Sequence, residues 1–295
     1  MKNYQYTNFL VSDLHSYNQQ FREALSFAGF NRKDKTHRLI VLGDIFDRGP
    51  DSLGIYQYLK SLPRHRKVLI KGNHEQLFDL LASKPFPDDY DFSNGTVKTF
   101  CHIAEIDPDL LDYRKQASLN YILGQYTDHE ILDHNLRKTW RTVKQKVLDH
   151  EIWAWLHSDE WVDYFEFDKY ICVHSFLPVS RGSYLVENWR QNASESDWMY
   201  SRWGCPWKQF NQGLFEDEAK NGKVLVCGHW HASDFHRVYE HDFRVQNNNL
   251  YFGKHLIALD AMTPTSGMIN VLRINPDGTC FNQYREELKY GSCRR

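Results

Sequence analysis

Polar side chains able to bind metal ions follow apolar runs at several separated places in the sequence. They are Asp13, His15, Asp44, Asp47, Asn73, His74, His174, His229 and His231. Carboxylate, imidazole and amide oxygen together suit borderline divalent metals such as Mn, Fe or Zn. The set has too many ligands for one tetrahedral site, and it is large enough for two ions that share one carboxylate.

The spacing within the set supports a shared site. Asp13-x-His15 and His229-x-His231 each place both side chains on one face if the backbone there is extended, because side chains alternate with period two. Each short pattern alone also fits an ordinary turn, an exposed strand end or a core histidine such as His174. The whole series, with each member closing an apolar run, favours a metal centre.

Three apolar segments would carry the first of these residues. They alternate with helical patterns and cover residues 8–15, 37–44 and 67–75. Strands separated by single helices favour right-handed crossovers and parallel pairing. Ligands in open α/β sheets gather outside the carboxyl ends of the strands, so these segments are expected to converge on one rim.

The middle of the chain has a different character. Residues 96–157 are polar and helix-rich, which indicates a helical insertion, and residues 137–156 show an amphipathic helix pattern. Strand patterns return from residue 161 onward and predict a second, partly antiparallel sheet. No linker or repeat is evident, so the sequence predicts one domain over residues 1–295.

Composition excludes several classes of protein. The formal net charge of -2 over 295 residues gives no overall attraction to nucleic acid or to an anionic membrane. Neither a long apolar segment nor a signal-peptide pattern is evident. The six cysteines are scattered without a C-x-x-C motif, so reduced thiols and a cytoplasmic location are expected. The oligomeric state is not indicated.

Five motifs occur in a recognisable order. SDLH, GDIFDRG, GNHE, VHS and GHWH span residues 9–232 and resemble the calcineurin-like metallophosphoesterases. GDIFDRG with GNHE resembles the phosphoprotein phosphatase branch, which includes bacterial Ser/Thr phosphatases and symmetrical diadenosine tetraphosphate hydrolases. The resemblance implies a four-layer α/β/β/α sandwich with two mixed sheets and a helical insertion.

The resemblance also implies metal ligands. Asp44 would bridge two divalent ions (Mn, Fe or Zn). The other ligands would be Asp13, His15 and His231 for the first ion, and Asn73, His174 and His229 for the second. His231 is a departure, because the phosphoprotein phosphatase branch commonly lacks the second histidine of G-H-x-H.

Further roles are implied for residues beside the metals. Asp47 would orient His74, which would act as general acid or as electrostatic partner to the leaving oxygen. Arg48 would hold the phosphate together with Asn73. A second phosphate-binding arginine is expected after the VHS motif. The first candidate is Arg202, and the lesser candidates are Arg181 and Arg190.

The expected reaction is in-line attack of a metal-bridging hydroxide on a phosphomonoester. The first expectation for the substrate is a phosphoprotein, as in Ser/Thr protein phosphatases. The alternative is a dinucleoside tetraphosphate, whose bases could stack on tryptophans around Arg202, although those rings could instead pack a loop. They are Trp189, Trp198, Trp203 and Trp207. A catalytically inactive metal-binding interaction module is the third possibility.

Overall fold

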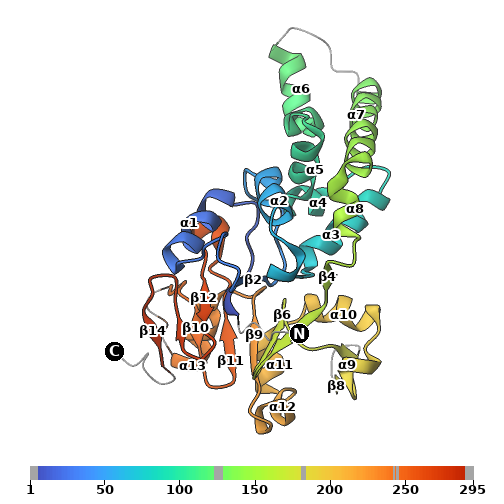
Figure 1. Ribbon diagram of the computed structural model, residues 1–295. Helices are drawn as coiled ribbons and strands as arrows, with labels where there is room; N and C mark the ends of the chain where they lie inside the picture. Colours follow the sequence, from blue (N-terminus) through green and yellow to red (C-terminus); the bar gives the residue numbers. More distant parts are fainter. Residues whose placement is uncertain (1–5, 123–128, 181–183, 242, 244–245, 290–295) are drawn as a thin grey trace.

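Two β-sheets lie face to face between layers of helices (Figure 1). The computed structural model describes residues 6–122, 129–180, 184–241, 243 and 246–289. Both sheets combine parallel and antiparallel pairs, which confirms the predicted mixed α/β fold. Among the described residues, none of the helices combines the length and apolar character needed to cross a bilayer.

The first sheet has the order β14-β13-β12-β1-β2-β3-β4. Its parallel strands are β1 (Thr7–Val11), β2 (His37–Val41), β3 (Lys67–Ile70) and β4 (Trp161–Val162). Its antiparallel strands are β12 (Leu272–Ile274), β13 (Cys280–Phe281) and β14 (Glu287–Leu288). The helices after the first three strands are α1 (Asn18–Ala28), α2 (Ser52–Lys60) and α3 (Asn73–Ser83).

The second sheet has the order β10-β11-β9-β6-β5. Its strands are β5 (Tyr164–Phe167), β6 (Tyr170–Val173), β9 (Val224–Cys227), β10 (Tyr251–Phe252) and β11 (Leu256–Ala258). The assignment of all later strands to this sheet was wrong for β4 and β12, which pair in the first sheet. Local pattern predicts a strand, but its partner depends on contacts between distant segments.

Successive side chains on a strand point to opposite faces of the sheet, so each strand contributes to the packing of two layers. On β1, Phe9 and Val11 pack against the helices, whereas Leu10 packs against the second sheet. On β2, Ile40 likewise lies between the sheets. Strands buried on both faces are expected to read as continuous apolar runs, as these do.

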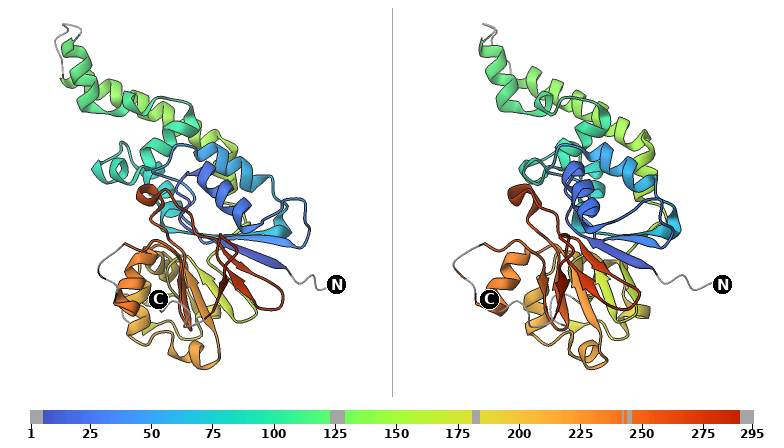
Figure 2. Two further views of the ribbon diagram at one scale, coloured as in Figure 1. Left: turned by 90° about the vertical axis from the view of Figure 1, so that its left-hand side faces the viewer. Right: turned by 60° about the vertical axis from the view of Figure 1, so that its left-hand side comes forward.

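The second sheet is covered by short helices on its outer face (Figure 2). They are α9 (Trp189–Asn192), α10 (Glu195–Arg202), α11 (Pro206–Asn211), α12 (Glu216–Lys220) and α13 (Ala232–Glu240). The remaining short elements are β7 (Val179–Ser180), β8 (Tyr184–Leu185), α14 (Thr263–Ser266) and the 3-10 helices at Arg64–Arg66 and Pro108–Leu111.

The chain between α3 and β4 forms a further group of helices, which extends away from the sheets (Figures 1 and 2). They are α4 (Asp89–Asn94), α5 (Thr96–Ala104), α6 (Tyr113–Ile122), α7 (His129–Asp149) and α8 (Glu151–Leu156). The single helix expected over residues 137–156 is interrupted at His150, whose Nδ1 accepts a hydrogen bond from the Ile152 N–H and caps α8.

Candidate metal centre

Loops from both sheets bring four of the predicted ligands, His15, Asp44, His174 and His229, together with His74, which was predicted as general acid. Ligand atoms of His15, Asp44 and His74 all lie within 4.8 Å of one another, and so do those of Asp44, His174 and His229. The predicted ligands Asp13 and His231 belong to neither group. Asp44 belongs to both groups and follows β2, so it occupies the position expected of a bridging carboxylate. Oδ1 of Asp44 also accepts a hydrogen bond of 2.9 Å from the backbone N–H of His74 at the start of α3.

The backbone of these loops is not extended, so the period-two argument was wrong for both D-x-H and H-x-H. Asp13 has φ 53°, His15 has φ 44° and His229 has φ 65°, all in the left-handed region. Asp44 has φ 53° as well. Non-glycine residues adopt this region at a cost and concentrate where the surrounding structure holds a functional loop.

A glycine contact fixes the distance between two of the loops. Gly43 has φ 80°, and a Cβ there would lie 2.6 Å from Cα of Gly72 and 2.7 Å from Nδ1 of His174. A side chain at this position would therefore separate the loop that carries Asp44 from the second sheet. The close approach accounts for the glycine at the end of β2.

Glu75 is a supporting residue that the sequence analysis quoted within GNHE without giving it a role. Its carboxylate accepts hydrogen bonds from the backbone N–H groups of Asp44 (2.9 Å), Ile45 (2.9 Å) and Gly72 (2.7 Å). One buried side chain thus holds the bridging loop and the start of α3 together.

The histidines present unprotonated nitrogens to the centre. Nδ1 of His15 lies 3.0 Å from the Phe46 carbonyl oxygen, and Nδ1 of His174 lies 2.7 Å from that of Leu42. A carbonyl only accepts, so each Nδ1 carries the hydrogen and each Nε2 keeps its lone pair. Burial lowers the pKa of both rings well below the usual value, which keeps them neutral.

Two contacts show that these donors fit a cation. Nε2 of His174 faces Oδ1 of Asn73 at 2.8 Å, an acceptor-to-acceptor contact that a cation bound by both atoms would relieve. Burial, followed by the charge of a neighbouring carboxylate, raises the pKa of Asp13 and of Asp44 well above the usual value. Divalent ions would compensate this buried negative charge, so the residues fit a metal pair.

Arg48 faces the centre as expected. Its Nη1 lies 2.8 Å from Nε2 of His15 and its Nη2 lies 3.2 Å from Nε2 of His74. A guanidinium can only donate, so both ring nitrogens act as acceptors here. The positive group therefore lies beside the nitrogen lone pairs that would bind or face an ion.

The helical insertion reaches the centre through Asp47. Nδ1 of His74 lies 2.7 Å from Oδ2 of Asp47, as predicted for an orienting carboxylate. The hydroxyls of Thr96 and Thr99 on α5 donate to the two carboxylate oxygens of Asp47 at 2.7 and 2.8 Å. The sequence analysis missed both threonines, because no motif covers the insertion.

His231 and Asp260 lie at the edge of the centre. The His231 side chain is 38% exposed, with Nδ1 3.7 Å from Asp234 and Nε2 4.0 Å from Oδ2 of Asp260. Asp260 follows β11, is buried and also raises the pKa of Asp13 by its charge. Sequence analysis missed Asp260, although it closes an apolar run as the other candidates do. A ligand role for His231 stays a prediction.

The candidate second arginine is held by carboxylates. Arg202 on α10 is 4% exposed, and its guanidinium donates to Glu195 and Asp163. Arg190 pairs with Glu166 and Glu218 instead, and Arg181 lies outside the described residues. Binding of phosphate by Arg202 stays a prediction.

The tryptophans near Arg202 differ in exposure. Trp189 and Trp198 are buried in the core between the second sheet and its helices. Trp203 is 39% exposed, and its ring centroid lies 6.4 Å from that of His229. Trp207 is partly buried and packs against the same core. The packing explanation therefore holds for three of the rings, while Trp203 is open for stacking beside the centre.

Two curated relatives match parts of the chain in sequence. The chain is 39% identical over 69 residues to a symmetrical bis(5'-nucleosyl)-tetraphosphatase of Buchnera aphidicola, which covers 23% of this chain and 24% of that protein. A protein of the same name from Nitrosospira multiformis is 27% identical over 157 residues, 53% of each chain. The matches thus span about a quarter of the length of the first relative and about half of the length of the second.

Solved structures and a family model extend the comparison. A putative diadenosine tetraphosphatase aligns with TM-score 0.46 at 16% identity over 99% of this chain and 97% of that one. A protein serine/threonine phosphatase from Saccharomyces cerevisiae aligns with TM-score 0.49 at 12% identity, over 99% and 82%. The model of the calcineurin-like phosphoesterases matches residues 9–233. With three quarters of its length matched, the chain belongs to the calcineurin-like phosphoesterase family.

Proposed function

We propose that this protein is a phosphoester hydrolase that uses two divalent metal ions. The observation that carries the proposal is the position of Asp44 in two overlapping groups of buried or half-buried ligands, with Arg48 at their edge. Two such ions, when bound, would activate a water molecule and polarise a phosphoryl oxygen. Mn, Fe and Zn all suit this ligand set.

The other residues have roles that follow from their contacts. The guanidinium of Arg48 would bind phosphate oxygens, for which its planar fork is well shaped. His74, when Nε2 is also protonated, would donate that proton to the leaving oxygen, since its Nδ1 is held by Asp47. Asn73 would complete the coordination of the second ion and contact the phosphate.

For the substrate we propose a dinucleoside polyphosphate. A phosphoprotein was the first expectation from the sequence, but the relatives from Buchnera aphidicola and Nitrosospira multiformis, both symmetrical bis(5'-nucleosyl)-tetraphosphatases, favour the dinucleotide. The exposed ring of Trp203 beside His229 is a surface on which a base could stack. A phosphoprotein is retained as the other outcome of the test.

The test uses protein loaded with Mn²⁺, and with Fe²⁺ or Zn²⁺ in parallel. We expect hydrolysis of p-nitrophenyl phosphate, and faster cleavage of diadenosine tetraphosphate than of a phosphoserine peptide. Turnover of the peptide alone would overturn the proposed substrate but not the reaction. Two bound metals without turnover of any of these compounds would overturn the reaction and favour a binding module.

A further inference from the structure

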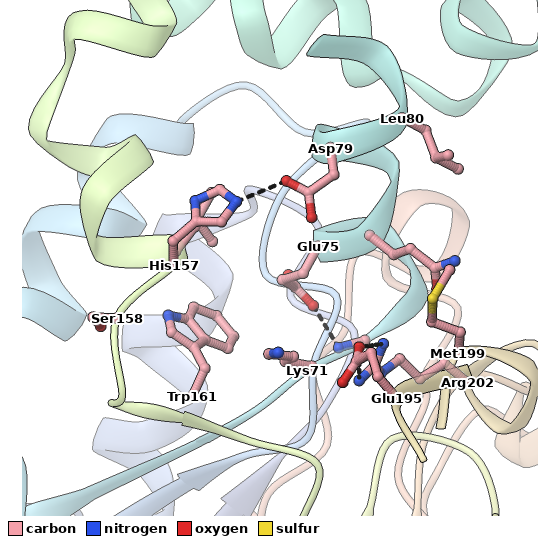
Figure 3. Close-up of a pocket in the computed structure, with 13 residues that line it drawn as sticks. Lys71, Glu75, Asp79, Leu80, His157, Ser158, Trp161, Glu195, Met199 and Arg202 are labelled. Carbon is pink, nitrogen blue, oxygen red and sulfur yellow. Dashed lines mark hydrogen bonds and ion pairs between the residues drawn. The ribbon is translucent and has the colours of Figure 1, made fainter. Parts of the chain in front are cut away.

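Asp260, which follows β11, differs in its partners from other carboxylates near the metal centre. Asp79 and Glu195 line a cavity of about 340 Å³ between α3, α8, β4 and α10, and they pair with His157 and Arg202 (Figure 3). Asp260 is only 4% exposed, yet in the part of the chain that the structure describes no lysine or arginine pairs with it. A buried carboxylate without a cation beside it is costly, so Asp260 requires an explanation.

Hydrogen bonds fix the loop of Asp260 against both loops that carry predicted ligands of the first ion. Its carbonyl oxygen accepts a hydrogen bond of 2.7 Å from the N–H of Ala232, the residue after His231. Three residues after Asp260, the hydroxyl of Thr263 donates to the carbonyl oxygen of Asp13 at 3.1 Å. Residues 260–263 are thus held against the His231 loop and the Asp13 loop at once, which sets the position of Asp260 relative to both predicted ligands.

The carboxylate of Asp260 faces the ring of His231. Its Oδ1 accepts a hydrogen bond of 2.7 Å from the Met262 N–H, and its Oδ2 lies 4.0 Å from Nε2 of His231. That distance is about 1 Å longer than a hydrogen bond, and the 38% exposed ring has room to rotate. Asp234 lies 3.7 Å from Nδ1 of the same ring, but it also pairs with Arg237. Among the described residues, Oδ2 of Asp260 has no hydrogen bond, so it is available to His231.

The charge of Asp260 also acts on Asp13. Burial is the largest cause of the raised pKa of Asp13, and the charge of Asp260 is the second. Burial raises the pKa of Asp260 as well, while the charge of His231 lowers it. Two buried carboxylates that repel each other in this way favour a cation beside them, so Asp260 increases the attraction for a divalent ion at Asp13.

From these contacts we propose that Asp260 positions His231 for the first ion, by accepting a hydrogen bond from Nε2 of that ring and leaving Nδ1 to bind the metal. The proposal rests on the proposed two-metal function. A carboxylate on the outer nitrogen of a metal-binding histidine fixes the tautomer and the orientation of the ring and raises its basicity. Because the ring of His231 is partly exposed, this contact would supply an orientation that packing alone does not.

The binding test is calorimetric titration of the metal-free protein with Mn²⁺, in which the ion weakened by His231→Ala identifies the first site. Asp260→Asn should weaken that ion about 5-fold, less than loss of the histidine itself, because it acts through the ring. The Met262 N–H holds the amide oxygen, so the NH2 group of the variant faces His231 and cannot accept a hydrogen bond. Affinity for the other ion should stay unchanged, which also shows that the variant is folded. Asp234→Asn is the matched control and should bind both ions as the wild type does.

A double-mutant cycle tests whether Asp260 acts through the ring. In a His231→Ala background, Asp260→Asn should cause no further loss of affinity for the first ion. The same loss in that background as in the wild type would overturn the proposal, and so would an equal loss for both ions. A wild type that binds two ions while Asp260→Asn shows no loss would overturn this proposal alone, whereas a wild type that binds only one would overturn the proposed function as well.

Discussion

The two halves of the metal centre differ in how completely they are assembled. At the proposed site of the second ion, ligand atoms of His174 and His229 already converge with Asp44, and Asn73 is in contact with His174. At the proposed site of the first ion, the predicted ligand His231 is 38% exposed, and its Nε2 lies 4.0 Å from Oδ2 of Asp260. We therefore expect the second ion to bind more tightly than the first.

The difference has a structural origin. His174 and His229 follow β6 and β9, which are neighbouring parallel strands, so one sheet sets their separation. In the first half, an oxygen of Asp13 accepts a hydrogen bond from the backbone N–H of His229, and Arg48 lies against Nε2 of His15. The first ion would have to displace the guanidinium, whereas the second would enter a group that is already formed.

The largest effect should follow loss of the bridge between the halves. Asp44→Asn should lower turnover of p-nitrophenyl phosphate by about 10³-fold or more, because both ions lose a ligand and each supplies several kcal/mol of stabilisation. Metal analysis by mass spectrometry should find fewer than two ions per chain. A variant that keeps both ions and near-normal turnover would refute the shared position of Asp44.

Substitutions of single ligands should distinguish the two halves of the metal centre by their effects on metal affinity. His174→Ala should weaken binding of the tighter ion by about 100-fold or more, since it removes a buried ligand, and His231→Ala should weaken the other ion by about 10-fold. Isothermal calorimetry with Mn²⁺ measures both affinities in each variant. Equal losses, or a larger loss for His231→Ala, would invert the comparison.

The sequence predicted which residues end the strands better than it predicted the backbone of the loops that follow. Residues at strand ends, such as Asn73 and His174, could be found because each closes an apolar run that the fold carries to one rim. The backbone of Asp13 could not be predicted, because its left-handed conformation is imposed by contacts with the loop after β2. Asp260 was missed because no short motif surrounds it.

The same limit applies to the fold. The two faces of β1 and β2 follow from alternation, so the layers were predictable. The pairing of β12 with β1 was not, because it joins segments about 260 residues apart through a register such as Asn8 with Ile274. The roles of Thr96 and Thr99 could not be predicted for a similar reason. Both donate to Asp47, and nothing near them in sequence indicates this contact.

Protonation should weaken the second half in the metal-free protein. Burial, the largest cause, lowers the pKa of His229 from 6.5 to about 4. Between pH 6.5 and about 4, the His229 ring is therefore protonated in the unfolded chain but neutral in the folded chain. The contribution of the neutral ring to the free energy of unfolding is present above pH 6.5 and is lost as the pH falls to about 4. The loss should reach about 3 kcal/mol.

His229→Gln isolates that contribution, since the raised pKa values of Asp13 and Asp44 act in the opposite direction in both proteins. Urea unfolding of the metal-free wild type and the variant between pH 7 and pH 4 measures the difference. Parallel stability curves for the two proteins would show that the ring is not held neutral by the fold.

Substitution of Asp47 should have a different effect from substitution of Asp44, although the two residues are only three positions apart. Asp47→Asn should keep both ions and lower kcat about 10- to 100-fold, because the amide holds His74 without stabilising its protonated form. The measurements are metal content and the dependence of kcat on pH, whose limb for the general acid should move to lower pH. Loss of metal in this variant would place Asp47 among the ligands instead.

The smallest effect should come from the helical insertion. Thr99→Val removes the hydroxyl that donates to Oδ1 of Asp47 and accepts the Asp47 N–H at 3.1 Å. The loss of about 1 kcal/mol should lower kcat about 5-fold and shift the same limb of the pH profile, with metal content unchanged. Thr99→Ser should restore both, and Thr142→Val on the exposed face of α7 is the control. If Thr99→Val left kcat and its pH profile unchanged, the insertion would support the fold alone, and the two halves of the centre would act without it.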